Sequence, residues 1–218
     1  MFSDLIESNS KMRDQKIGGI ALGIVTANKD PQNPGRVKVK FPWFTDNDES
    51  YWARVTTFMA GKDRGAFFLP EVNDEVVVAF DHGDVNHPYI LGALWNGQDK
   101  PIETNSNGKN NIRKIKSRSG HEIIFNDNHE QKKEKIEIIT KSGHSILLDD
   151  SAGSEKIEIK DKTGNNSINI DSVQNAINIS SQMKLSIKAN MIEIESNGMM
   201  SIKAGAILNI QGSLVKIN

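Results

Sequence analysis

The stretch that decides the fold runs from Ala176 to Asn218 and reads AINISSQ, MKLSIKAN, MIEIESNG, MMSIKAG, AILNIQG and SLVKIN in succession. A three-residue unit recurs along this stretch, in which the first and third residues are apolar. These units start at residues 177, 185, 192, 200, 208 and 215, which are 8, 7, 8, 8 and 7 residues apart. This alternation is the period-two pattern of a strand with one buried face. The apolar pairs are Ile177 and Ile179, Leu185 and Ile187, Ile192 and Ile194, Met200 and Ile202, Leu208 and Ile210, and Val215 and Ile217.

Such short strands cannot bury an apolar face alone, so the segment must coil on itself or wrap around other copies of the chain. A single-chain β-helix usually needs about 20 or more residues per coil. A unit of seven or eight residues supplies only one face and one corner, which favours three chains closing a triangular prism; a single-chain helix remains the alternative. The paired apolar residues then form the predicted trimer core. Outward charges such as Lys188 and Glu193 argue against an aggregation-prone β tail.

Composition excludes several classes of protein. A length of 218 residues fits one or two domains, and a formal net charge of −1 gives no electrostatic case for binding nucleic acid or an anionic membrane. The absence of cysteine excludes disulfides and thiol chemistry. The first residues show no secretory signal pattern, and no stretch approaches the roughly 18 apolar residues of a membrane span. We therefore expect a soluble protein made in the cytoplasm, which can still belong to a larger particle.

The chain is predicted to be all-β, in four parts. Residues 1–16 form an N-terminal arm, 17–100 an OB-fold domain, 101–116 a linker and 117–218 the β-helix. Residues 17–100 are predicted to form a small antiparallel barrel, because short strand-like segments alternate there with turn signals. These segments are IALGIVTA, RVKVKF, WARVTT, AFFL, EVVVAF and YILGALW.

A longer repeat precedes the C-terminal units. SGHEIIFND at Ser119 recurs as SGHSILLDD at Ser142, 23 residues later, and TGNNSINID at Thr163 is a weaker third copy. KIEI at Lys135 recurs at Lys156, 21 residues later. This spacing predicts hairpin-like strand pairs that widen the prism before it narrows toward the C-terminus.

Several ordered motifs carry a resemblance to a known family. They are DPQNPGRVKVKFPW from Asp30, YWARV from Tyr51, FFLPEVNDEVVVAFDHGD from Phe67 and PYILGALWNG from Pro88. This series resembles the phage baseplate assembly protein V/VgrG family, the spikes of contractile phage tails and of type VI secretion. The resemblance implies an OB fold followed by a homotrimeric β-helical needle, which contacts the target membrane transiently and has no cofactor and no enzymatic activity.

Departures from larger family members suggest the partners. About 16 residues precede the barrel, so the resemblance implies a hub or tube adaptor on a separate polypeptide, and the linker leaves no room for a lysozyme domain. The C-terminal segment lacks the His-x-His motif with which some spikes bind iron. We therefore expect a separate PAAR-type tip protein to dock on the last residues, namely Leu214, Val215, Lys216, Ile217 and Asn218.

Chemistry-bearing residue types occur, but in patterns typical of turns. The acidic run of Glu71, Asp74 and Glu75 could hold an acid/base pair, and His82-Gly83-Asp84 a metal fragment, yet both fit polar turns. In Ser119-Gly120-His121 and Ser142-Gly143-His144, serine and histidine are too close in sequence for triad geometry, and their repetition favours structural corners. No P-loop, dinucleotide or zinc spacing occurs. We expect no catalytic, cofactor or metal site.

The main alternative is an OB-fold nucleic-acid-binding protein with a β-repeat oligomerisation tail. Arg36, Lys38 and Lys40 alternate along one predicted strand and therefore point the same way. The nearby aromatic residues that could stack on bases are Phe41, Trp43, Phe44, Trp52 and Phe58. A solvated or subunit-facing basic strand explains the same pattern, and the repeat tail offers nothing for nucleic acid, so we expect no nucleic-acid partner.

Overall fold

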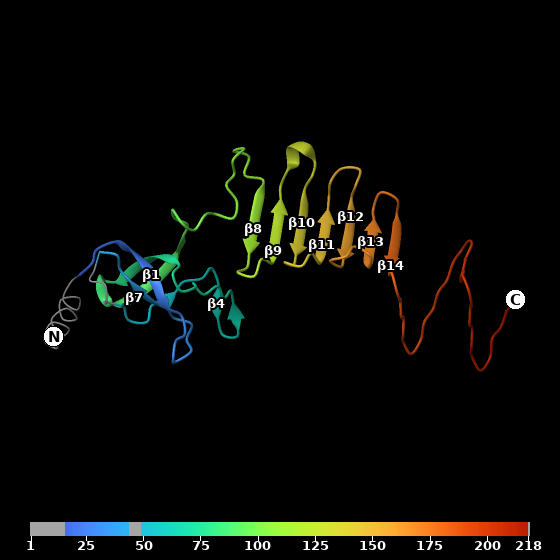
Figure 1. Cartoon of the computed structure of the whole chain (residues 1–218), viewed down its shortest axis with the longest axis horizontal. Helices are drawn as coiled ribbons and strands as arrows, with labels where there is room; N and C mark the ends of the chain where they lie inside the picture. The colour runs from blue at the N-terminus through green and yellow to red at the C-terminus, as the bar shows by residue number, and fades with distance from the viewer. Residues whose placement is uncertain (1–15, 44–48, 218) are drawn as a thin grey trace. The chain divides into compact units, whose positions relative to one another are not determined.

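The computed structural model of the chain describes residues 16–43 and 49–217 (Figure 1). In this described part the regular structure is β-strand, apart from one 3-10 turn at His129–Gln131, so the predicted all-β class is confirmed. The chain divides into two compact units between Ser106 and Asn107, and each is treated separately below. Residues 1–15 of the predicted arm lie outside the described residues. No described helix is long and apolar enough to cross a membrane.

The first unit is built on a five-stranded sheet in the order β2-β1-β6-β7-β3. The pairs β2–β1, β1–β6 and β6–β7 are antiparallel, and β3 pairs with β7 in parallel. A small two-stranded ribbon joins β4 to β5. The strands are β1 (Ile20–Ala27), β2 (Lys38–Lys40), β3 (Arg54–Val55), β4 (Ala60–Gly61), β5 (Arg64–Gly65), β6 (Glu75–Asp81) and β7 (Asp84–Leu94).

The core of this unit follows the alternation of its strands. Val76, Val78 and Phe80 point inward from β6, and Val25, Val37, Val39 and Ile90 are completely buried beside them. Gly23 sits where an added Cβ would lie 3.2 Å from Val39, so a glycine lets β1 approach β2 closely. The segment AFFL (66–69), predicted as a strand, is not one. The ribbon β4–β5 instead forms where the glycines had predicted only a turn.

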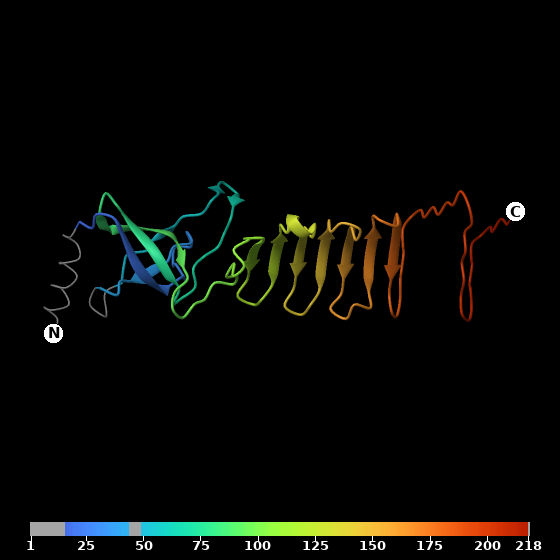
Figure 2. The ribbon, with the colours of Figure 1, turned by 90° about the horizontal axis from the view of Figure 1, so that it is seen from above.

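The second unit is a seven-stranded antiparallel sheet in which every strand pairs with its neighbour in sequence (Figures 1 and 2). The predicted hairpins are thus joined into one continuous meander of five-residue strands. These are β8 (Ile112–Lys116), β9 (Glu122–Asn126), β10 (Lys135–Ile139), β11 (Ser145–Asp149), β12 (Lys156–Lys160), β13 (Ser167–Asp171) and β14 (Ala176–Ser180).

Each turn of the meander contains a residue with positive φ. Such a backbone conformation reverses the chain tightly, and glycine adopts it without a steric penalty. In chain order these residues are Gly120 (φ 91), Lys132 (φ 51), Gly143 (φ 97), Gly153 (φ 78), Gly164 (φ 74) and Asn175 (φ 52). No described residue after Asn175 has a positive φ.

Residues 181–217 contain no strand within the single chain. The sequence predicts a strand in each of the apolar units from Ile177 to Ile217, yet only the first unit, in β14, is one. A strand is defined by hydrogen bonds to a neighbour, and one chain offers these later units no neighbour. In both views the chain after β14 does not return alongside it (Figures 1 and 2).

Candidate functional site

The most unusual surface of the described chain is an uncovered apolar face on the meander. Its side chains stand in two rows that run across the strands, as the strand register shows. The first row is Phe125, Ile136, Leu148, Ile157, Ile170 and Ile177. The second row is Ile115, Ile123, Ile138, Ile146, Ile159, Ile168 and Ile179. We call these two rows the apolar face.

Every side chain of the apolar face is between 37% and 69% exposed in the single chain. Soluble monomers rarely leave a continuous apolar patch of this kind open, and large open patches mark interaction surfaces. The cause lies in the five-residue strands β9 to β14, whose second and fourth positions are apolar and share one side of the sheet; in β8 only the fourth position is apolar. An exposed apolar face of this kind indicates an interaction surface.

The opposite face of the meander, called here the polar face, carries ion-paired lysine and carboxylate side chains, together with one leucine and three isoleucines. One row places Lys135, Asp149, Lys156 and Asp171 opposite one another on successive strands, so that the charges alternate. Such opposite-charge neighbours each contribute about 0.2–1 kcal/mol. The separation of apolar and charged sides indicates which side of the sheet faces water.

Ion pairs within the polar face bind its strands together. Glu122 Oε1 accepts a hydrogen bond from Lys116 at 2.9 Å, and its Oε2 lies 3.1 Å from the Lys114 Nζ. These hydrogen bonds, first from Lys116 and then from Lys114, hold the pKa of Glu122 below its ordinary value. Burial raises the pKa of Asp149, but hydrogen bonds from Ser151 and the charges of Lys135 and Lys156 outweigh it, so the pKa is lowered.

A repeated contact links the turns on one side of the sheet. The backbone N–H of Lys141 donates to His121 Nδ1 at 3.2 Å, and that of Lys162 donates to His144 Nδ1 at 3.2 Å. In the third copy the N–H of Gln182 donates to Asn166 Oδ1 at 3.1 Å. One side chain in each turn therefore holds the backbone of the next turn. The Ser-Gly-His motifs are thus structural corners here, as the sequence favoured.

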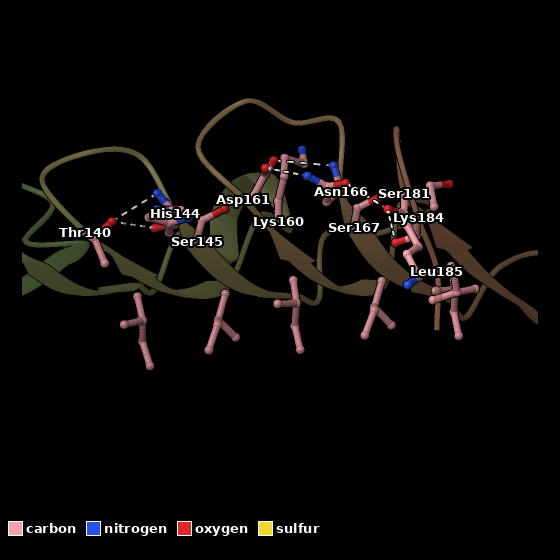
Figure 3. A pocket seen from close by; sticks show the side chains of 16 residues that line it. Thr140, His144, Ser145, Lys160, Asp161, Asn166, Ser167, Ser181, Lys184 and Leu185 are labelled. Carbon is pink, nitrogen blue, oxygen red and sulfur yellow. Dashed lines mark hydrogen bonds between the residues drawn. The ribbon is translucent and has the colours of Figure 1, made fainter. Parts of the chain in front are cut away.

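The last of these corners gathers several polar side chains (Figure 3). Asn166 Nδ2 donates to Asp161 Oδ2 at 2.7 Å, and Thr163 Oγ1 donates to the same carboxylate at 2.9 Å. The hydrogen bond from Asn166 is the main cause that lowers the pKa of Asp161 to about 2; burial opposes the shift, and Thr163 adds to it. Ser181 Oγ donates to the Lys184 carbonyl at 2.9 Å.

A hollow of about 550 Å³ lies beside this corner, lined by the second row of the apolar face and by Leu185. Five isoleucines of that row and Leu185 form its apolar wall, and polar side chains, among them Thr140, Lys160 and Lys184, form the rest (Figure 3). Because it is continuous with the apolar face, it belongs to the assembly surface rather than to a separate ligand site.

The structure brings only part of the predicted trimer core together. Ile177 and Ile179 lie in the two apolar rows, on β14. The others lie outside any strand, are exposed, and stay a prediction: Leu185, Ile187, Ile192, Ile194, Met200, Ile202, Leu208, Ile210, Val215 and Ile217. Sequence reasoning missed the upstream residues from Ile115 to Ile170, although the repeated KIEI and SGH motifs carried the signal.

The predicted tip-docking residues stay a prediction as well. Leu214, Val215 and Ile217 are exposed, as is Lys216, and Asn218 lies outside the described residues.

The residues considered for catalysis lie in turns or at the first residue of a strand, as Glu75 and Asp84 do. Asp74 Oδ2 accepts from the Glu71 backbone N–H at 2.8 Å, and Glu75 accepts from the Asn96 side chain at 2.9 Å. Asp84 Oδ2 lies 2.9 Å from His87 Nδ1, and hydrogen bonds from Asn86 first and His87 second lower the pKa of Asp84. Within residues 16–43 and 49–217, no three metal-binding side chains gather at one place. These contacts account for the acidic run and for His82-Gly83-Asp84 as turn structure.

Two of the three basic side chains considered for binding nucleic acid are paired with carboxylates. Val37 and Val39 are buried, so Lys38 and Lys40 do point outward together, as predicted. Arg36 Nε, however, donates to the buried Asp30 at 2.6 Å, and Lys38 donates to Glu49 at 3.1 Å. These contacts lower the pKa of both carboxyl groups.

The aromatic residues near that strand do not form a stacking platform. Phe41 is buried and lies 5.3 Å from Trp43 and 5.7 Å from Phe80 between ring centroids. Trp52 sits under the Lys38 ammonium at 5.7 Å, whereas Phe58 is exposed beside the β4–β5 ribbon. Phe44 lies outside the described residues. The nucleic-acid alternative therefore gains no support from this face.

Residues 21–95, which span almost all of the strands of the first unit, match the type VI secretion system/phage-baseplate injector OB domain. Over these residues the chain is similar to the VgrG/phage-baseplate V family. Its first unit is accordingly an OB fold, as the sequence predicted. The match leaves the meander of the second unit outside the family domain.

Curated relatives match parts of the chain. The chain is 34% identical over 99 residues to the type VI secretion system spike protein VgrG1a of Pseudomonas aeruginosa, covering 43% of this chain and 15% of that protein. It is 42% identical over 67 residues to the spike protein VgrG3 of Vibrio cholerae, covering 29% of this chain and 7% of that protein. A third relative, the actin cross-linking toxin VgrG1 of Vibrio cholerae, is 36% identical over 74 residues, covering 32% of this chain and 7% of that protein. The chain therefore spans only a small fraction of the length of these relatives.

Proposed function

We propose that this chain belongs to the VgrG family and is the structural central spike of a contractile injection system of the type VI secretion or phage-tail class. The relatives named as spike proteins and the injector OB domain support this role. The observation that carries the proposal is the uncovered apolar face of the second unit, which only further copies of a sheet with the same pattern would match along its whole length.

The dimensions of the strands favour three copies. Each strand has five residues, which gives a face about 17 Å wide at about 3.4 Å per residue. A triangle with such sides has its centre about 5 Å from each face, and this is half of the spacing of about 10 Å between packed sheets. One layer of isoleucine or leucine per face therefore fills the prism. Four faces would leave the axis about 8.5 Å away and the centre empty.

In this arrangement the polar face, with its paired lysine and carboxylate side chains, lies outside. The seven- or eight-residue units of residues 181–218 continue the prism as a narrower, intertwined shaft. The needle acts mechanically: contraction advances it, and its small cross-section concentrates force on the target membrane. We assign the protein no catalytic step. The family resemblance adds a hub or tube adaptor on the OB side and a PAAR-type tip protein at residues 214–218.

The oligomeric state tests the proposal most directly. Light scattering in mild buffer should give about three times the chain mass of 24.2 kDa. A folded monomer would refute the needle. A particle of twice the chain mass would replace the prism with a two-sheet sandwich, which also covers the apolar rows but leaves their ends open.

A further inference from the structure

The corner after β14 differs from the equivalent corners before it. Gly143, His144, Ser145 and Ile146 open β11 in sequence, and Gly164 precedes Asn165, Asn166, Ser167 and Ile168 at the start of β13. The corresponding residues after β14 are Lys184, Leu185, Ser186 and Ile187. The Ser-Ile pair that starts a strand is kept, but the two residues before it are different.

The first change removes the reversal. Gly143 and Gly164 have φ values of 97° and 74°, which a residue with a Cβ rarely adopts. Counted back from the serine that opens each strand, Lys184 replaces Gly143 and Met183 replaces Gly164. The described residues from 176 to 217 contain no positive φ. A chain without such a residue cannot make the same tight antiparallel turn.

The second change removes the contact between successive turns. His121, His144 and Asn166 each accept the backbone N–H of the following turn, at 3.1–3.2 Å. Leu185 occupies the next position in this series, and its side chain has no hydrogen-bond acceptor. Asn166 thus makes the last of these contacts, to Gln182, and nothing of this kind holds the chain beyond it.

We infer that the corner Ser181–Leu185 is the point where each chain leaves its own sheet and begins to pair with other copies. The residues at 184 and 185, rather than the repeats downstream, set this position. The inference rests on the proposed trimeric needle and goes beyond it, because it names the residues that decide between pairing within a chain and pairing between chains.

The change from pairing within a chain to pairing between chains follows from the backbone on both sides of the corner. β14 pairs with β13 on one side, and its other edge has no strand partner in the described chain. Residues 185–217 carry apolar units but no strand. Unpaired strand edges recruit another strand, and in a particle built of identical copies the neighbouring copy is the strand available.

The test restores the earlier corner. The double variant Lys184→Gly/Leu185→His recreates Gly-His-Ser-Ile at residues 184–187. In the β10–β11 hairpin, Ile139 pairs with Ser145, six residues later. The same spacing would pair Ser180 with Ser186 and therefore place residue 178 opposite residue 188. The chain has no cysteine of its own, so Asn178→Cys/Lys188→Cys reports this pairing as a disulfide.

The reporter pair is introduced both with and without the corner variant. A matched control pair, Glu158→Cys/Asn169→Cys, joins positions that already face each other on β12 and β13. Trimers are assembled from mixed ¹⁵N-labelled and unlabelled chains, oxidised and digested. A disulfide within one chain gives only linked peptides in which both halves carry the same label. Disulfides between chains also give mixed-label peptides, about half of the total in a 1:1 mixture, so the mixed fraction measures the interchain share.

The 178–188 disulfide within one chain should be near background in the parent corner and become the main product in the restored corner. The control disulfide should form within one chain in both, which shows that the meander is folded. Intrachain 178–188 linkage in the parent corner, or its absence in the restored corner while the control forms, would overturn the inference and leave the trimer intact. A monomeric parent protein in light scattering refutes the proposed needle instead, whatever the disulfides show.

Discussion

Replacing Ile157 with aspartate probes the apolar face at the middle of the meander. Ile157 lies in the first row, between Leu148 and Ile170 on the neighbouring strands, and is 41% exposed in the single chain. Assembly would cover that remaining fraction. Because full burial of an isoleucine stabilises by about 1.5–3 kcal/mol, the substitution removes about 0.6–1.2 kcal/mol per chain, or about 2–4 kcal/mol per trimer.

The charge adds a larger cost. Three carboxylates would face one another near the axis without a basic partner, and each buried unpaired ion costs several kcal/mol. The total exceeds the apolar loss and should abolish the trimer at micromolar concentration. A single chain already exposes this position to water, so the isolated meander should tolerate the aspartate. We therefore expect folded monomers rather than aggregates.

The matched control lies one residue away on the other side of the sheet. Glu158→Gln breaks the 2.8 Å pair with Lys160 on the polar face. Such a partly exposed pair contributes about 0–1 kcal/mol, so this variant should remain a trimer. Light scattering gives the mass, and circular dichroism gives the strand content. If Ile157→Asp assembles as well as Glu158→Gln, the apolar face does not point toward the axis.

Two further predictions follow. In the shaft, Ile194→Asp should prevent stable assembly while Glu193→Lys should be nearly neutral, because only the first is predicted to face the axis; equal light-scattering masses would show that the inward assignment is wrong. At the last corner, the pKa of Asp161 is lowered from 3.8 to about 2 by hydrogen bonds from Asn166 and Thr163. Because the pKa of Asp161 is lowered, its ionised carboxylate stabilises the corner above pH 3.8, and this stabilisation is lost as the pH decreases toward 2. The protection of the Asn166 amide from exchange should therefore decrease between pH 3.8 and pH 2. Asp161→Asn should lose that pH dependence, and an unchanged profile in this variant would contradict the assignment.

The sequence predicted much of this fold because its alternation is strong. KIEI and SINI place apolar residues at every second position, and the glycines in SGH and TGN mark the turns. The shorter elements were less predictable. β3, β4 and β5 have two residues each. AFFL is rich in strand-forming residues, yet in the described chain only its Ala66 makes a backbone–backbone hydrogen bond, to Met59, and the segment is not a strand. Residues 66–69 show that strand propensity without a partner strand is not sufficient.

The assembly surface was harder to predict in full, for a physical reason. The predicted core began at Ile177, where the apolar units recur every seven or eight residues, whereas the apolar face begins at Ile115. Upstream, the same two-residue pattern is separated by turns of unequal length, one of which contains the 3-10 turn His129–Gln131, so the period is obscured. Only the register, which brings Ile123, Ile138 and Ile146 side by side, shows that the upstream strands share one face.

Leu185 connects the two architectures of the second unit. The position that holds His144 and Asn166 in the earlier corners must supply an acceptor, and a leucine there ends the series of turn-to-turn contacts. The same leucine begins the first apolar unit after β14, together with Ile187. An apolar residue in place of a polar one therefore removes the contact that keeps the chain in its own sheet and adds a side chain that needs to be buried against other copies. If these two effects are separable, the chain of the Leu185→Ser variant should still leave its sheet at this corner, because the substitution restores no glycine with positive φ at residue 184. The same variant should weaken the first layer of the shaft, because serine buries less apolar surface than leucine.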